Sequence, residues 1–251
     1  MSNLFCYFSP RRRMQPDKTR NEIIRLNGLS NREFLERYAR AGCIGLSGGI
    51  TMIDRAICRA ERHLEEEEHW SAWSHAFLFQ GQRADRHHWL IESDLQVHRR
   101  HIQLGVQENR VSKYFDEELY TVLAVLDFGL KESQVELLVR EGLELVANRA
   151  RYSLRELLGT FLALRRPALR GRVNLLARER SLYCSALVRH LFRRVDLDLT
   201  PGVDVKNTTP EDIARTAVPH VTYWLEHEWA RSKLKQMRTK LRSLSRRHGR
   251  Q

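Results

Sequence analysis

The sequence contains no long apolar run: no stretch approaches the ~20 residues that a bilayer-spanning helix needs. It also lacks a secretory pattern, because the apolar stretch from Leu4 to Phe8 is short and the basic run Arg11 to Arg13 follows it instead of preceding it. These absences argue against a transmembrane or secreted protein. We expect a cytoplasmic location, peripheral at a membrane at most.

Cysteine is scarce, with four residues in 251, namely Cys6, Cys43, Cys58 and Cys184. Four thiols in a chain of this length do not form a disulfide scaffold. A thiol that acts as a nucleophile must also be reduced. Both considerations favour a reducing compartment.

Recognisable nucleotide and metal motifs are missing. The glycine-rich run Gly45 to Gly49 has neither a Gly-Lys-Ser nor a GxGxxG frame, so it predicts a turn and not a phosphate cradle. The acidic run Glu65 to Glu68 lies between His63 and His69, which are six residues apart and lack the i, i+4 spacing of two ligands on one helix face. We interpret it as a solvated helix face and expect no metal ion and no cofactor.

Three short segments carry a His, a carboxylate and a Cys beside apolar residues: Trp73 to Phe79, Trp89 to Glu92 and Tyr183 to Val188. The first two predict a hairpin whose connection is Gly81 to His87. If Phe79 faces His88, His75 lies directly opposite Glu92 on one face of the sheet. The carboxylate would then accept the imidazole Nδ1 proton and leave Nε2 as a base. Asp94, two residues further on the same face, is the reserve candidate.

Cys184 precedes a helical pattern formed by Leu187, Val188, Leu191, Phe192 and Val195. The spacing places Cys184 in the first turn of a helix. Unpaired backbone N–H groups and the positive end of the dipole favour a thiolate there, and the same N–H groups suit an oxyanion. The alternative is that Cys184 is a small buried apolar residue, as most free cysteines are.

These segments, together with Thr209-Pro210-Glu211-Asp212, resemble the circularly permuted papain-like hydrolases, in particular the YaeF/YiiX-like amidases and the related lecithin:retinol acyltransferase-like enzymes. In that group the His strand precedes the Cys helix, as it does here. The resemblance implies Cys184 as the nucleophile, His75 as the base and Glu92 as the orienting residue. Two positions depart from the family pattern: Gly42-Cys43 replaces a Gly-Asp pair, and Ala186 replaces a Glu.

The fold class expected from the pattern is α+β, with a small antiparallel sheet packed against helices. Helices are predicted at Asn31 to Ala41, around Ile50 to Ile57, at Glu132 to Asn148 and at Leu154 to Leu164. The apolar run Leu119 to Leu126, within Val111 to Asp127, predicts a strand that closes the sheet. At 251 residues the chain fits one domain with extensions. We assign residues 1–30 to a basic N-terminal extension, 31–222 to the permuted papain-like domain and 223–251 to a basic amphipathic helix.

The net charge of +12 is concentrated at Arg11 to Arg13, at Arg165 to Arg180 and beyond Arg231. Such stripes attract polyanions. The segment 231–251 also repeats Leu234, Met237, Leu241 and Leu244 at intervals of three and four, which makes a narrow apolar seam on a cationic helix. The seam could bind an anionic membrane surface, an acidic partner or the protein's own domain.

Together these features predict a cysteine-dependent hydrolase of amide or ester bonds that works through a thioester acyl-enzyme. Its substrate would be a peptide, another amide or an acyl-lipid. The same chemistry with a different acceptor gives an acyltransferase. The main rival is a non-catalytic basic protein that binds nucleic acid or a membrane on a decayed papain-like domain, although no nucleic-acid-binding motif is visible and nucleic acid is the less favoured partner.

Overall fold

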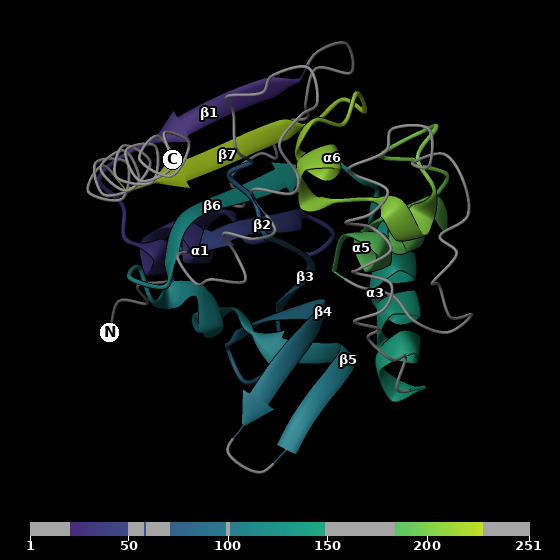
Figure 1. Ribbon diagram of the computed structural model, residues 1–251, viewed down its shortest axis with the longest axis horizontal. Helices are drawn as coiled ribbons and strands as arrows, with labels where there is room; N and C mark the ends of the chain where they lie inside the picture. Colours follow the sequence, from purple (N-terminus) through teal and green to yellow (C-terminus); the bar gives the residue numbers. More distant parts are fainter. Residues whose placement is uncertain (1–20, 50–57, 59–70, 99–100, 149–183, 228–251) are drawn as a thin grey trace, which may run out of the picture.

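The computed structural model describes residues 21–49, 58, 71–98, 101–148 and 184–227. They form one seven-stranded sheet with the order β1-β7-β6-β2-β3-β4-β5 (Figure 1). Its strands are β1 (Glu22–Leu26), β2 (Ile44–Gly49), β3 (His75–Gln82), β4 (His88–His98), β5 (His101–Arg110), β6 (Tyr120–Asp127) and β7 (Val221–Glu226). β1 and β7 are parallel, and the other neighbouring strands are antiparallel. The sheet is therefore mostly antiparallel, as the α+β class predicts.

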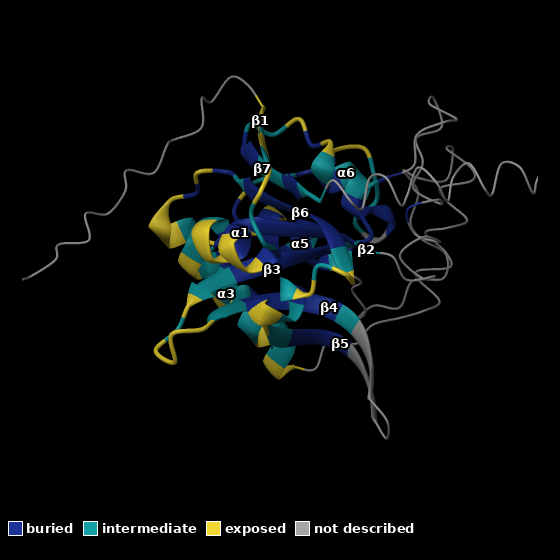
Figure 2. Cartoon of the chain, turned by 90° about the vertical axis from the view of Figure 1, so that its left-hand side faces the viewer, coloured by how far each residue is buried: buried dark blue, intermediate teal, exposed yellow. Residues whose placement is uncertain are grey.

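Helices cover both faces of the sheet. The described helices are α1 (Asn31–Tyr38), α3 (Glu132–Ala147), α5 (Cys184–Arg193) and α6 (Pro210–Ala214), with 3₁₀ turns η1 (Val111–Phe115) and η3 (Val205–Asn207). One core joins the sheet to α3, α5 and α6, and a second core joins the opposite face to α1 and η1. The buried central strands lie between these layers (Figure 2).

The structure confirms some of the predicted helices and strands and not others. The helices expected at residues 31–41 and 132–148 correspond to α1 and α3. The strand expected over the apolar run Leu119 to Leu126 corresponds to β6, but it lies between β7 and β2 and does not close the sheet at an edge. The helices expected around 50–57 and at 154–164 fall outside the described residues. The permuted papain-like arrangement stays a prediction.

The turn predicted at Gly45 to Gly49 is wrong, because these residues belong to strand β2. A Cβ atom on Gly45 would lie 2.0 Å from the Phe77 ring, and one on Gly48 would lie 1.9 Å from the Ala72 carbonyl oxygen. Glycine is therefore present because neighbouring groups approach the strand closely, and not because the chain reverses direction.

The sheet reaches beyond the range 31–222 at both ends. β1 lies within the segment assigned to the N-terminal extension, and β7 ends at Glu226. Of the residues that the structure describes, no helix combines the length and the apolar character that crossing a membrane requires.

Candidate active site

Strands β3 and β4 bring His75 and Glu92 to one face, in a register that differs from the predicted one. Phe77, and not His75, lies opposite Glu92, and Phe79 lies opposite Leu90. The difference arises because β3 continues to Gln82 across an irregularity between Phe79 and Gly81, where Gly81 has a φ of +92°. The slip is two residues, so Glu92 keeps its face and becomes the diagonal neighbour of His75.

The imidazole of His75 and the carboxylate of Glu92 are hydrogen-bonded, with 2.7 Å between Nε2 and Oε2. The expectation that Nδ1 would make this contact is therefore wrong. Nε2 is committed to the carboxylate, which leaves Nδ1 as the nitrogen available for a thiol. The side chain of His75 is 16% exposed and that of Glu92 is fully buried, so the pair lies at the boundary between core and surface.

Glu92 accepts three further hydrogen bonds. Asn109 Nδ2 and Lys113 Nζ both donate to Oε1 at 2.6 Å, and the Tyr114 hydroxyl donates to Oε2 at 2.6 Å. Lys113 Nζ also lies 2.6 Å from Asp94 Oδ2. The reserve candidate Asp94 thus pairs with the lysine, while Glu92 is the carboxylate that holds the imidazole.

Electrostatics keep this carboxylate ionised. Burial alone would raise the pKa of Glu92, but the hydrogen bond from His75 and the positive charges of His75 and Lys113 lower that pKa far below its usual 4.5. Burial alone would lower the pKa of His75, whereas a Cys184 thiolate and the Glu92 carboxylate raise it well above 6.5. The site therefore favours an imidazolium between two anions.

Cys184 is the first residue of α5, as the helical spacing predicts, and it is partly exposed. Burial alone would raise the pKa of its thiol. The charge of His75, a hydrogen bond with its side chain, and the backbone N–H groups of Ala76 and Ser185 together lower the pKa below 9.0. The structure thus brings Cys184, His75 and Glu92 together in the order that a nucleophile, a base and an orienting group require.

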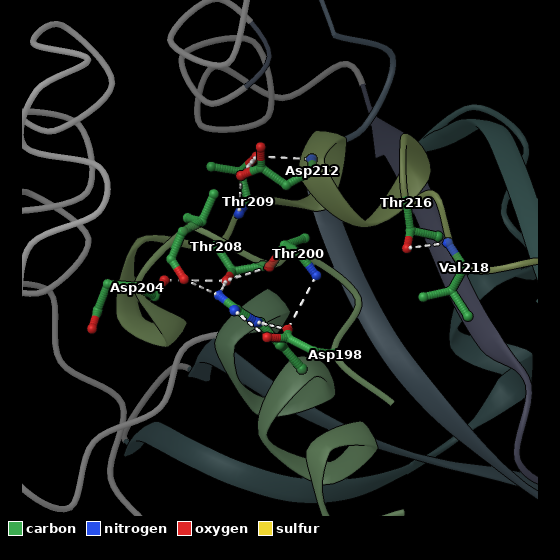
Figure 3. Close-up of polar contacts among 10 residues, drawn as sticks. Asp198, Thr200, Asp204, Thr208, Thr209, Asp212, Thr216 and Val218 are labelled. Atoms are coloured by element: carbon green, nitrogen blue, oxygen red, sulfur yellow. Dashed lines mark hydrogen bonds and ion pairs between the residues drawn. The ribbon is translucent and has the colours of Figure 1, made fainter. Parts of the chain in front are cut away.

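Buried polar contacts fix the start of α5. The Ser185 hydroxyl donates to the Thr208 carbonyl oxygen at 2.7 Å. One turn further, the buried Arg189 guanidinium bonds Asp198 through two nitrogens and donates to the Thr208 hydroxyl at 3.0 Å. Asp198, Thr200 and Thr208 are labelled around this cluster in Figure 3. Since these bonds tie α5 to the loop that follows it, they hold Cys184 in place.

The start of β3 is fixed in a similar way. The backbone N–H of Ser74 donates to the Ser47 carbonyl oxygen at 2.9 Å. The buried Trp73 ring packs edge-on against Trp224 of β7, with 4.6 Å between ring centroids. Both contacts immediately precede His75, so they limit the positions its backbone can take.

Sequence reasoning missed Asn109, Lys113 and Tyr114. They belong to the end of β5 and to η1, and nothing in their spacing marks them, because they approach Glu92 only after the β4–β5 hairpin has formed.

The described segments contain no group of three or more His, Cys, Asp or Glu side chains placed to hold a metal ion. The acidic run at residues 65–68 lies outside those segments.

Comparison with known proteins gives a distant structural likeness. No family model matches the chain, and no curated protein matches it in sequence. The crystal structure of the metalloprotein YiiX from Escherichia coli O157:H7 is similar over 74% of this chain and 96% of that one, with 10% identity and a TM-score of 0.48. This likeness assigns no family and no chemistry to this chain.

Proposed function

We propose that the chain is a cysteine-dependent hydrolase of amide or ester bonds, with Cys184 as the nucleophile. The observation that carries the proposal is the 2.7 Å contact between His75 Nε2 and Glu92 Oε2, beside a thiol whose pKa is lowered by the same imidazole. A carboxylate, an imidazole and a thiol in series are the groups that acyl transfer to sulfur requires.

In this reaction the Cys184 thiolate attacks the substrate carbonyl carbon and forms a tetrahedral oxyanion. The N–H groups in the first turn of α5, which have no acceptor within the helix, are suited to stabilise that oxyanion. The His75 imidazolium gives its proton to the leaving amine or alcohol as the C–N or C–O bond breaks, and a thioester remains on Cys184. Imidazole then takes a proton from water, whose oxygen attacks the thioester carbon. The C–S bond breaks, the acid is released, and the Cys184 thiolate and the His75 imidazolium are restored. Glu92 orients the ring throughout.

A pH profile of thiol alkylation tests the proposal. Intact protein is treated with iodoacetamide from about pH 5 to 9, and each cysteine is quantified by mass spectrometry. We expect Cys184 to be alkylated at mildly acidic pH, where the buried Cys43 and Cys58 stay unmodified. The variant His75→Gln should shift this reactivity to higher pH, because it removes the imidazolium.

A Cys43→Ala variant is the matched control, since it removes a thiol that the proposal does not use. A second measurement follows thioester formation directly, as an acetyl mass increase at Cys184 after brief treatment with p-nitrophenyl acetate. If Cys184 reacts at the same pH as an unperturbed thiol and gains no acetyl group, the proposed nucleophile is wrong.

A further inference from the structure

An apolar groove runs along α3, away from the candidate active site. It has a volume of about 660 Å³ and passes between α3 and the segment at Ala41. Its floor consists of Val135, Val139, Leu143 and Ala147, which recur every four residues and therefore form one line along the helix. The valines and Leu143 are half-buried, so this line is only partly covered by the rest of the protein.

The rim of the groove is acidic in a chain that is strongly basic overall. The exposed Glu132, Glu136 and Glu144 line it, against a single cation at Arg140. A carboxylate-rimmed apolar groove suits a helix that carries basic residues on both sides of an apolar seam. Such a ligand would bury its seam and keep its charges at the rim.

The sequence contains a segment of this chemistry. Residues 231–251, which lie outside the described residues, include nine Lys or Arg and no Asp or Glu. As a helix, the seam from Leu234 to Leu244 would be ~15 Å long, against ~18 Å for the line from Val135 to Ala147. We propose that residues 231–251 of this chain dock in the α3 groove through the Leu and Met seam.

The connection is long enough for this docking. Tyr38, three residues before Ala41 of the groove, stacks on Tyr223 of β7 with 4.3 Å between ring centroids. β7 continues from Tyr223 to Glu226 in the direction away from Ile44, so the tail begins about 10 Å beyond this stack. Leu234 follows His227 by seven positions, with six residues between them, and this stretch spans up to ~23 Å when extended.

Zero-length carbodiimide coupling of the intact chain tests the docking. The reagent joins a carboxylate to a lysine amine only when the two are in contact, and the tail offers Lys233, Lys235 and Lys240. We expect these lysines to couple to Glu136 and Glu144 and not to Glu33 or Glu36 of α1. Raising the salt concentration from ~0.05 to ~0.5 M should lower the yield several-fold, since the rim charges are exposed.

Two variants separate docking from simple charge attraction. Val139→Asp places a negative charge on the floor of the groove, and Leu241→Asp places one in the seam of the tail. Neither variant adds a cation, and each should abolish the coupling. Ile23→Asp changes an apolar residue that is 57% exposed on β1 and should leave the coupling intact. Since Leu241 lies in the tail, its variant remains informative if Val139→Asp unfolds the domain. In a mixture of ¹⁵N-labelled and unlabelled chains, we expect the coupled tail and groove to belong to the same copy, and coupling only between copies would overturn the proposal.

Coupling that persists in both Asp variants would overturn the proposal, as would equal coupling to α1 and α3. The same holds if the tail lysines stay uncoupled while the intact protein sediments with phosphatidylserine vesicles, because the tail would then bind a membrane surface instead of the groove.

Discussion

Replacing Lys113 by Met tests whether the buried network around Glu92 stabilises the protein. The ammonium group lies 2.6 Å from a carboxylate oxygen of both Glu92 and Asp94, and the lysine side chain is 23% exposed. Met is close to the lysine stem in length and apolar, so the substitution removes the charge with little change in packing. It leaves Glu92 with His75, Asn109 and Tyr114 as hydrogen-bond donors.

The expected loss follows from those remaining partners. Removing one member of a fully buried ion pair costs about 3 to 5 kcal/mol of unfolding free energy, because the other charge stays buried without its partner. Glu92 keeps three donors, and Lys113 is partly solvated, so the cost should lie lower. We expect about 2 kcal/mol, which is near the contribution of a hydrogen bond to a charged group.

The loss should depend on pH. The pKa of Glu92 is lowered on folding, so its contribution is present above the usual value of 4.5 and is lost as the pH falls through the folded-state pKa. The pKa of Lys113 is raised, so its contribution is present below 10.5 and is lost as the pH rises through the folded-state pKa. The difference between wild type and variant should be constant from about pH 5 to 10 and should shrink in acid.

Urea unfolding monitored by tryptophan fluorescence at pH 7 and in steps from about pH 5 down to about pH 2 measures both effects. Arg32→Met is the matched control, since it removes an exposed cation 4.0 Å from Glu36, with side chains 66% and 56% exposed. Its cost should stay below about 1 kcal/mol. Equal losses for the two variants at pH 7, or a Lys113 loss that is unchanged in acid, would refute the reasoning.

Three other substitutions follow from the site and the sheet. Cys184→Ala should abolish esterase turnover and leave the thermal midpoint within a few degrees of wild type, whereas full turnover would place the nucleophile elsewhere. Glu92→Gln should reduce the turnover number but retain measurable activity, because it disturbs the orientation and charge of His75 without removing a reacting group; a variant as active as wild type would remove Glu92 from the mechanism. Gly45→Ala should destabilise the fold by about 1 to 3 kcal/mol in urea unfolding, because the new Cβ would lie 2.0 Å from the Phe77 ring; an unchanged midpoint would show that the ring moves freely.

The candidate site was partly predictable because side chains alternate between the two faces of a strand, so a register error of two residues leaves a side chain on the predicted face. The predicted pairing of β3 and β4 was displaced by two residues, and side chains return to the same face after two residues. His75 and Glu92 therefore remained together. The predicted contact through Nδ1 was wrong, because the imidazole nitrogen that faces Glu92 depends on the diagonal approach of the carboxylate. No sequence pattern encodes that approach.

Tertiary contacts account for what could not be predicted. The run from Gly45 to Gly49 has the composition of a turn, yet the close approach of Phe77 and the Ala72 carbonyl makes glycine the residue that fits a strand at that point. Lys113 and Tyr114 lie in a short 3₁₀ turn whose spacing shows neither helix nor strand periodicity. By contrast, α1, α3 and the start of α5 follow from local apolar spacing, which the tertiary structure leaves unchanged.

The separation of the site residues along the chain has a consequence for the kinetics of folding. His75 and Cys184 are more than 100 residues apart, and β4, β5, β6 and α3 all lie between them. Closing so long a loop costs conformational entropy. The contact therefore forms only after the local hairpin and helices between its ends have formed and shortened the effective loop. The depressed thiol pKa depends on that contact, so iodoacetamide reactivity at acidic pH should be among the last native properties to return during refolding. A chain emerging from the ribosome would accordingly carry an ordinary, unreactive thiol until α5 has packed against the start of β3.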